Sequence, residues 1–339
     1  MSTPAARSRA RTEQQTGAPL LQVEGLKTYY PIRRGVFSRT AGQIKAVDDV
    51  SLQIREGETL GLVGESGCGK STLGRSIVRL ENPAAGSIRF EGEDITFLSR
   101  RELVRVRTRL QMIFQDPYSS LNPRKEIGAT LAEPLLAHGL ADRRQVQGRV
   151  ERLLDLVGLP KSHQHRYPHE FSGGQRQRIG IARALALEPK LKAWDEPVSA
   201  LDVSIQAQIL NLLGDLQKEL GLTYLFIAHG IGAVKYISRR IAVMYLGRIV
   251  EIGEEQTLFR RPKHPYTQIL LQAYPPPDPL LRTRNRIVIQ GDVPNPADPP
   301  AGCRFHTRCP YVQERCRHEE PPLAEAGVGH AAACHYPLQ

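Results

Sequence analysis

Two glycine-rich segments contain the residues of this sequence that are best suited to chemistry. The first, "GLVGESGCGKST", fits the pattern G-x-x-x-x-G-K-[ST] from Gly64 to Ser71. Glycines let the backbone turn so that successive N–H groups point at an anion, and the helix that follows adds the positive end of its dipole. We therefore expect Lys70 to reach the β- and γ-phosphates of a nucleotide and the Ser71 hydroxyl to ligate Mg²⁺. The candidate nucleotide contacts in this loop are Gly64, Glu65, Ser66, Gly67, Cys68, Gly69, Lys70, Ser71 and Thr72.

Three further polar residues close strand-like runs. Asp195 and Glu196 end "LKAWDEP", and His229 ends "TYLFIAH". Ligands bind at the carboxyl ends of the strands in open α/β sheets. We expect Asp195 to hold Mg²⁺ through water, Glu196 to polarise an attacking water and His229 to contact the γ-phosphate. A lone histidine is more often structural, but the order of these residues after the phosphate loop makes them a set.

The elements that must position these residues are strands alternating with helices. The runs "LLQVEGLKTYY" and "IKAVDDVSLQI" predict antiparallel strands, "GSIRFEGEDI" predicts a further β segment, and residues 116–187 predict a mainly helical region. Strand-like "LKAWDEP", "LTYLFIAH" and "RIAVMYLGRIVEIG" are interrupted by the helical "SIQAQILNLLGDLQKEL". This alternation predicts an α/β fold with a mostly parallel sheet and helices on both faces. Residues 1–20 are expected to be a disordered tail, residues 21–260 the nucleotide-binding domain and the proline-rich residues 261–339 a separate extension.

The composition limits the cellular setting of the chain. It has 339 residues, of which 46 are basic and 35 acidic, giving a formal charge of +11. That excess could favour nucleic acid, an anionic membrane face or nucleotide phosphates, or could simply solvate the surface. The longest nearly apolar run, residues 222–234, has only 13 residues and contains a histidine, too short for a membrane span. The arginine-containing N-terminus has no apolar stretch behind it and is not a secretory signal, so we expect a cytoplasmic protein.

In their order, the phosphate loop, "FSGGQ", "WDEP", "SALD" and "AHG" resemble an ABC ATPase over residues 20–260. The resemblance implies a P-loop NTPase fold, with a RecA-like mixed or parallel sheet, an antiparallel β subdomain and a helical subdomain at about residues 116–187. It also implies a purpose for the second glycine-rich segment, which would cap the γ-phosphate of ATP bound to another subunit. The matching residues are Ser172, Gly173, Gly174 and Gln175.

The same resemblance assigns roles to single positions. Tyr30 matches the aromatic residue that stacks on adenine, with Tyr29 a weaker candidate. Gln115 matches the glutamine that senses Mg²⁺ and couples to the transport subunit, and Asp202 the aspartate that links the two sites of a dimer. The resemblance also makes Glu196 the catalytic base and His229 the γ-phosphate switch.

Departures from the family pattern affect rate and stability more than nucleotide binding. Lys192 and Trp194 interrupt a strand that is normally wholly apolar, and a buried lysine is costly unless it is paired or reaches solvent. Gly230 follows His229 where aspartate is usual, and Arg240 stands where another acid is common.

Four of the five cysteines lie close together in sequence, as Cys303-x5-Cys309-x6-Cys316-x17-Cys334. In a reducing compartment such a cluster favours a metal over disulfides, and four thiolates suit Zn²⁺ or an iron–sulfur cluster. The segments "HPYTQILLQAYP", "GDVPNPADPPAGCRFHTRCP" and "RCRHEEPPL" resemble the C-terminal extension of oligopeptide/dipeptide permease ATPases. That resemblance favours [4Fe–4S], with Zn²⁺ and an unmetallated or disulfide-bonded state as alternatives. Cys68 is separate, and the amide dipoles of the phosphate loop are expected to lower the pKa of its thiol.

The function implied by the resemblance is that of the ATPase subunit of a bacterial peptide importer, using ATP and Mg²⁺. "YYPIRRGVFSRTAGQIKAVDDVSL" resembles the second of the two ATPase types in the oligopeptide/dipeptide permease group. The implied partners are two transmembrane permease subunits, a second ATPase that is a related chain or another copy, and an extracytoplasmic solute-binding protein. The chain would lie on the cytoplasmic side of the membrane and bind no nucleic acid. Two alternatives stay open: a soluble ABC ATPase acting on nucleic acid or ribosomes, which the basic excess favours slightly, and an interaction subunit that has lost hydrolysis.

Overall fold

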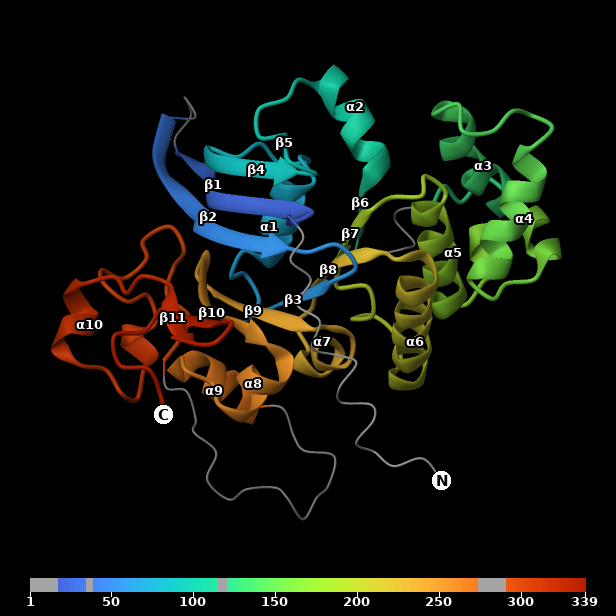
Figure 1. Cartoon of the computed structure of the whole chain (residues 1–339). Coiled ribbons are helices and arrows are strands. Elements are labelled where there is room, and N and C mark those ends of the chain that lie inside the picture. Colours follow the sequence, from blue (N-terminus) through green and yellow to red (C-terminus); the bar gives the residue numbers. More distant parts are fainter. Residues whose placement is uncertain (1–17, 35–38, 115–120, 274–290) are drawn as a thin grey trace, which may run out of the picture.

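The chain folds around two β-sheets, a small antiparallel one and a large mixed one (Figure 1). The computed structural model describes residues 18–34, 39–114, 121–273 and 291–339. The strands are β1 (Leu21–Arg34), β2 (Arg39–Ile54), β3 (Thr59–Val63), β4 (Ala85–Phe90), β5 (Glu93–Asp94), β6 (Leu110–Ile113), β7 (Leu191–Asp195), β8 (Thr223–Ile227), β9 (Arg240–Tyr245), β10 (Arg248–Glu254), β11 (Ala324–Gly327) and β12 (His330–Ala332). The helices are α1 (Lys70–Ile77), α2 (Arg100–Arg109), α3 (Ile127–Ala137), α4 (Val146–Leu156), α5 (Gly173–Leu185), α6 (Val203–Leu220), α7 (Ile231–Ile237), α8 (Glu255–Arg260), α9 (Pro265–Gln272) and α10 (Glu314–His318).

The large sheet has the strand order β11-β12-β10-β9-β3-β8-β7-β6. From β6 to β9 neighbouring strands run parallel, and from β9 to β11 they run antiparallel. Every residue of β3, β7 and β8 is buried, which is typical of parallel strands covered on both faces. The predicted α/β fold with a mixed or parallel central sheet is therefore confirmed.

The small sheet, ordered β2-β1-β4-β5, is antiparallel throughout, as its sequence pattern predicted. Helix α1 lies between the two sheets, since it contacts β1 and β2 on one side and β7 and β8 on the other. Its buried residues Leu73 and Ile77 belong to a core that includes side chains from both sheets. The loop before α1 is thereby fixed at the carboxyl end of β3, where the phosphate site was expected.

A helical layer flanks the β6 end of the large sheet, where α3, α4 and α5 pack together (Figure 1). Its core residues include Ile127 of α3, Leu154 of α4 and Ile181 of α5. The predicted helical region started at residue 116, but residues 115–120 lie outside the described part of the chain. The sequence analysis did not anticipate α2 and β6, which precede this layer.

The C-terminal extension is continuous with the nucleotide-binding domain. Strand β12 adds to the edge of the large sheet, with Glu251 and Ile252 of β10 opposite Ala332 and Ala331. The buried ring of Phe305 belongs to the same core as the central strands. The described residues of the extension therefore share the sheet and the core of the preceding residues, and the predicted boundary at residue 261 stays a prediction.

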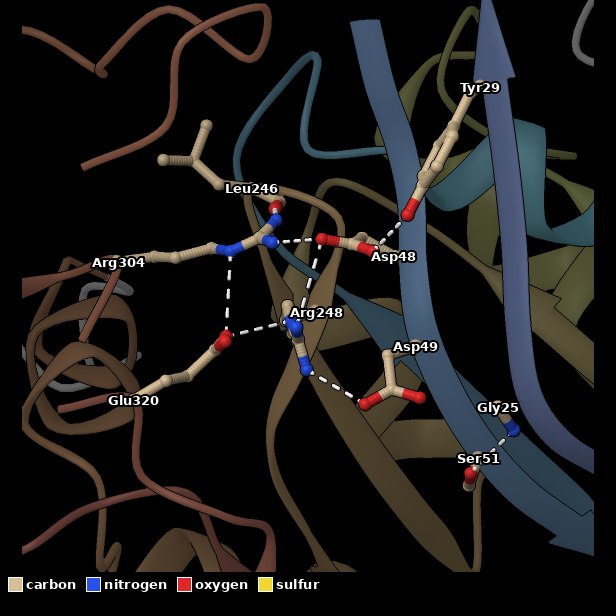
Figure 2. Close-up of polar contacts among 9 residues, drawn as sticks. All are labelled: Gly25, Tyr29, Asp48, Asp49, Ser51, Leu246, Arg248, Arg304 and Glu320. Carbon is tan, nitrogen blue, oxygen red and sulfur yellow. Dashed lines mark hydrogen bonds and ion pairs between the residues drawn. The ribbon is translucent and has the colours of Figure 1, made fainter. Parts of the chain in front are cut away.

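A polar network also ties the extension to the small sheet (Figure 2). Arg304, whose side chain is 8% exposed, pairs with Asp48 of β2. Nε of Arg248 forms an ion pair with Oε1 of Glu320 of the extension, at 2.8 Å. Asp48 also accepts a 2.5 Å hydrogen bond from the hydroxyl of Tyr29, and burial together with this bond raises the pKa of Tyr29 to about 12. Charge-assisted hydrogen bonds of this kind are stronger than neutral ones.

Two further sequence predictions concern the N-terminal tail and the lack of a membrane span. The expected tail over residues 1–20 falls mostly on residues 1–17, which lie outside the described residues, and β1 begins at Leu21. In the described ranges, no helix combines the length and hydropathy needed to cross a bilayer.

Candidate functional site

The phosphate loop joins β3 to α1 and closes around the ammonium group of Lys70. Nζ donates to the carbonyl oxygens of Gly64 at 2.8 Å and Glu65 at 3.0 Å, and the lysine is only 4% exposed. Gly69 has a φ of 103°, and a Cβ there would lie 1.9 Å from the carbonyl oxygen of Ala46. Only glycine fits this position, because both the backbone angle and the close approach exclude a side chain. A buried cation inside a tight turn before a helix is suited to binding phosphate.

Ser71 and Asp195 meet beside this loop. The Ser71 hydroxyl donates to Oδ1 of Asp195 at 2.7 Å, although the two residues come from α1 and the end of β7. Asp195 is 3% exposed. Hydroxyl and carboxylate oxygens are the ligand types that Mg²⁺ prefers, so this pair fits the ion in chemistry and in position next to the phosphate loop.

Glu196, His229 and Lys70 form a chain of contacts on the other side of the same site. Oε1 of Glu196 lies 2.6 Å from Nε2 of His229, and Nδ1 of His229 lies 3.5 Å from Nζ of Lys70. Glu196 has a φ of 51°, a left-handed conformation that non-glycine residues seldom adopt and that is concentrated at functional sites. Its second oxygen, Oε2, is buried and has no hydrogen-bond partner in the described part of the chain. A carboxylate with one oxygen to spare can accept a proton from water.

Strand alternation separates the two candidate adenine-stacking residues. The Tyr29 hydroxyl is bonded to Asp48, toward the extension. Burial raises the pKa of Tyr30, whose side chain lies close to Thr72 of α1 and to Glu81, which both also influence that pKa. Tyr30 is therefore beside α1, whereas the Tyr29 hydroxyl is bonded to Asp48, and the contact of Tyr30 with adenine stays a prediction.

The second glycine-rich segment starts α5. Ser172 is the N-cap residue, and its hydroxyl accepts from the Gln175 N–H at 3.4 Å while the Gln175 side chain accepts from the Ser172 N–H at 3.1 Å. This reciprocal pair is a capping box. A Cβ on Gly174 would lie 2.5 Å from Cγ2 of Ile205, so the position has no room for a side chain. The first turn of α5 thus has a bare backbone, as an anion-binding helix end requires.

The residues that pack against this glycine-rich segment come from the start of α6 and the turn before it. A Cβ on Gly173 would lie 3.5 Å from Cδ2 of Leu201. The next residue, Asp202, is the exposed N-cap of α6, and its side chain makes no capping hydrogen bond. Figure 1 shows α5 and α6 standing beside the large sheet, while α1 lies between the sheets. The structure therefore places the second glycine-rich segment (residues 172–175) beside Asp202 and not beside the phosphate loop of the same chain.

Gln115 lies outside the described residues. A cavity of about 540 Å³ opens beside Phe114. It is lined by residues of β6 and of the helical layer, including the exposed Phe114, Asn122 and Pro134.

The expectation for Cys68 was wrong. Its side chain is only 3% exposed, and burial raises the pKa of the thiol despite the neighbouring Lys70. The lone glycine-loop pattern suggested amide dipoles as the main influence. Desolvation outweighs them, because the thiol is buried among core side chains, although its Sγ lies 3.8 Å from Nζ of Lys70.

The four C-terminal cysteines converge on one small cavity. Cys303, Cys309, Cys316 and Cys334 all line one cavity of about 20 Å³, roughly the space for one water molecule. All are free thiols, and burial raises the pKa of Cys303 to about 12 and that of Cys309 to about 11. Within the described ranges, no three cysteine, histidine or acidic side chains are grouped as metal ligands would be. The donor chemistry fits the expected iron–sulfur or zinc site, and the four thiols share one cavity.

The residues that depart from the family pattern have different surroundings. Lys192 is 1% exposed, and Nζ has no hydrogen-bond partner in the parts of the chain that are described. Arg240 pairs with Glu58 at 3.0 Å, so its charge is balanced. Gly230 is the exposed N-cap of α7 with an ordinary φ of −80°.

Two residues near the site were missed by the sequence analysis. Tyr266 and Arg308 of the extension both contact Glu65 of the phosphate loop. They lie within the quoted segments "HPYTQILLQAYP" and "GCRFHTRCP", but a single sequence carries no sign of so distant a contact.

Comparison with known proteins agrees with this geometry. The chain matches the family described as ABC transporter over residues 47–199. It matches the family described as oligopeptide/dipeptide transporter, C-terminal region, over residues 250–316.

Individual proteins match over almost the whole chain. The oligopeptide transport ATP-binding protein AppF of Bacillus subtilis is 52% identical over 322 residues, covering 93% of this chain and 97% of that protein. The probable peptide ABC transporter ATP-binding protein y4tS of Sinorhizobium fredii is 53% identical over 316 residues, covering 93% and 89%. A solved dimeric structure of the ATP-binding cassette MJ0796 in a post-hydrolysis state, bound to ADP and Pi, superposes with a TM-score of 0.62 at 27% identity, covering 69% of this chain and 98% of that one.

Proposed function

Because the chain belongs to the ATP-binding proteins of ABC transporters, in the group with the oligopeptide/dipeptide transporter C-terminal region, we propose that it powers import of di- and oligopeptides, or related small solutes, into bacteria. The observation that carries this is the union of an ATPase site with that C-terminal region in one folded unit. The alternative, a soluble ABC ATPase acting on nucleic acid or ribosomes, finds no support in the relatives reported above, whose names describe peptide transport.

Hydrolysis follows from the charges gathered around the phosphate loop. Lys70 binds the β- and γ-phosphates, and its ammonium must exchange the carbonyls of Gly64 and Glu65 for phosphate oxygens. Ser71 and Asp195 hold Mg²⁺, which would neutralise phosphate charge when bound. Glu196 orients the attacking water through its unpartnered oxygen, and His229 fixes the other oxygen and faces the γ-phosphate.

The second glycine-rich segment serves a nucleotide on a second ATPase subunit. Ser172, Gly173 and Gly174 form a bare helix N-terminus at the start of α5, and Asp202 is the N-cap residue of α6, which packs against α5. A partner that presents bound ATP to this surface would complete both sites. The partner is a related chain or another copy of this one, and Tyr30 stacks on the adenine within each phosphate-loop half.

The cavity of about 540 Å³ lined by β6 and the helical layer is the docking position for a membrane subunit. Its rim combines the exposed ring of Phe114 with Lys125 and Glu133 of the helical layer, suited to an amphipathic helix. Gln115, next to Phe114 in sequence, would report that contact to the Mg²⁺ site. We propose two transmembrane permease subunits and an extracytoplasmic solute-binding protein as the other partners, with this chain on the cytoplasmic face of the membrane.

A metal centre on the four cysteines remains part of the proposal. Its support is the convergence of Cys303, Cys309, Cys316 and Cys334 on one cavity, with [4Fe–4S] preferred and Zn²⁺ as the alternative. Binding of the cluster or of Zn²⁺ would require the thiols to rearrange. The bound group would then cross-link the proline-rich extension. Iron, sulfide and zinc contents of protein purified without oxygen decide the matter, and colourless protein free of both metals contradicts it.

The importer proposal is tested with the assembled complex in proteoliposomes. Peptide uptake and ATPase rate are compared for the native chain, Glu196→Gln and the exposed control Glu219→Gln. The first variant should lose at least about a hundredfold in ATPase rate and abolish uptake, because general-base catalysis contributes that much. The control should match the native chain. Co-purification with nucleic acid in place of membrane subunits, or uptake that survives in Glu196→Gln, would overturn the proposal.

A further inference from the structure

Glu65 places a carboxylate inside a loop that binds phosphate. It follows Gly64 directly, and its carbonyl oxygen is one of the two that accept from Lys70. A carboxylate this close to a nucleotide repels the phosphates unless another charge balances it. The balancing charge comes from the C-terminal extension.

Arg308 provides that charge through a two-pronged contact. Its Nη1 lies 2.8 Å from Oε2 of Glu65, and its Nη2 lies 3.2 Å from Oε1. The Arg308 side chain is 7% exposed and that of Glu65 25%. Nη1 also donates to the Tyr245 hydroxyl at 3.3 Å, so the guanidinium is held from a second side. Forked arginine–carboxylate pairs with little solvent access are directional and strong, unlike exposed ion pairs.

Tyr266 holds the backbone of the same residue. Its hydroxyl accepts a hydrogen bond from the Glu65 N–H at 2.8 Å. The ring is fully buried and packs against Tyr245 and Phe305, with ring centroids 4.8 and 5.4 Å apart. A rigid aromatic ring with its hydroxyl in a fixed place sets the direction of the Glu65 peptide, and with it the direction of the loop that follows.

We propose that Arg308 and Tyr266 are positioning residues for the nucleotide, which act through Glu65 and make the C-terminal extension a determinant of Mg-ATP affinity. The inference rests on the proposed role of the loop in ATP binding. Arg308 neutralises the carboxylate and turns it from the phosphates, while Tyr266 orients its peptide. ATP has one more phosphate than ADP, so an unbalanced Glu65 disfavours ATP more than ADP. An arginine that only fastened the extension would affect both nucleotides alike.

The test measures how Arg308 and Glu65 depend on each other. Dissociation constants for Mg-ADP and a non-hydrolysable Mg-ATP analogue are measured by titration calorimetry for the full chain, Arg308→Met, Glu65→Gln and the double variant. In the native background, Arg308→Met should weaken the ATP analogue about tenfold and ADP about threefold. In the Glu65→Gln background the same change should alter each constant less than about twofold, because no unbalanced carboxylate remains.

Equal losses in both backgrounds, or equal losses for the two nucleotides, would overturn the proposal. The exposed Arg315→Met in the same extension is the matched control and should leave both constants unchanged. If Arg308→Met does not fold, the same dissociation constants are measured for Tyr266→Phe. It removes only the hydroxyl and should weaken the ATP analogue about threefold, so an unchanged constant refutes the role of the extension. A native chain that bound no Mg-ATP would instead contradict the assignment of the loop itself.

Discussion

Replacing Lys192 with methionine should make the protein more stable at neutral pH. Lys192 is the second residue of β7 and lies opposite Gln111 of β6 and Tyr224 of β8. Its side chain is 1% exposed, and burial lowers the pKa of the ammonium from 10.5 to about 7. Methionine keeps a long flexible stem in the same space and removes the amine that has to be desolvated.

The size and pH range of the effect follow from linkage. Below pH 7 the amine is protonated in the folded and unfolded chain alike. Between pH 7 and 10.5 the folded chain holds fewer protons than the unfolded chain, so the free energy of unfolding rises with pH. A pKa lowered from 10.5 to about 7 corresponds to a rise of up to about 5 kcal/mol, at about 1.4 kcal/mol for each pH unit. Lys192→Met should recover a large part of this at pH 7 and little at pH 10.

Urea unfolding at pH 7, 8.5 and 10 measures the difference. The comparison uses the native chain, Lys192→Met and Lys218→Met, a control on the exposed side of α6. The free energy of unfolding of the native chain and of Lys218→Met should rise with pH. The difference between these two proteins and Lys192→Met should therefore become smaller as the pH rises. A variant less stable than the native chain at pH 7, or a gap that does not depend on pH, would show that the amine is compensated.

Three more outcomes are expected. Gly174→Ala places a methyl group against Ile205, so the ATPase rate of the assembled complex should fall at least about tenfold while the isolated chain keeps its affinity for Mg-ATP, and an unchanged rate would be contrary evidence. Cys68 should react with iodoacetamide at pH 7.5 at least about tenfold more slowly than a cysteine in a model peptide, measured by mass spectrometry; equal rates would show an open, ionised thiol. Arg304→Met removes the buried guanidinium that pairs with Asp48 and leaves the carboxylate only its weaker contacts with Tyr29 and Arg248, so it should lower the free energy of unfolding by about 3 kcal/mol in urea titrations, with partial recovery on adding Asp48→Asn; no loss would mean that solvent reaches the carboxylate.

Local patterns in the sequence were sufficient for the nucleotide site. Lys70 and Ser71 are defined by a short motif, and Asp195, Glu196 and His229 stand at strand ends that hydrophobic runs reveal. Because parallel strands meet at one edge of a sheet, correct strand assignment already placed these residues together. The contacts at 2.6–3.5 Å among them are therefore the part of the structure that the sequence predicted best.

Long-range packing was beyond the sequence. Glu65 and Arg308 are 243 positions apart, and nothing in either segment indicates the other. The direction of the Cys68 thiol depends on how the two sheets close over α1, which no local pattern encodes. Strands β11 and β12 were missed because proline-rich flanks conceal short strands that form only against an existing sheet edge.

The position of β12 affects how the protein is made. Residues 330–332 cover the edge of β10, which the ribosome has synthesised much earlier. Until that strand emerges, a nascent chain exposes an unpaired row of backbone groups, the kind of surface that recruits other strands and promotes aggregation. Premature termination before residue 330 would therefore harm solubility, even though the phosphate loop, Asp195, Glu196 and His229 had already been translated.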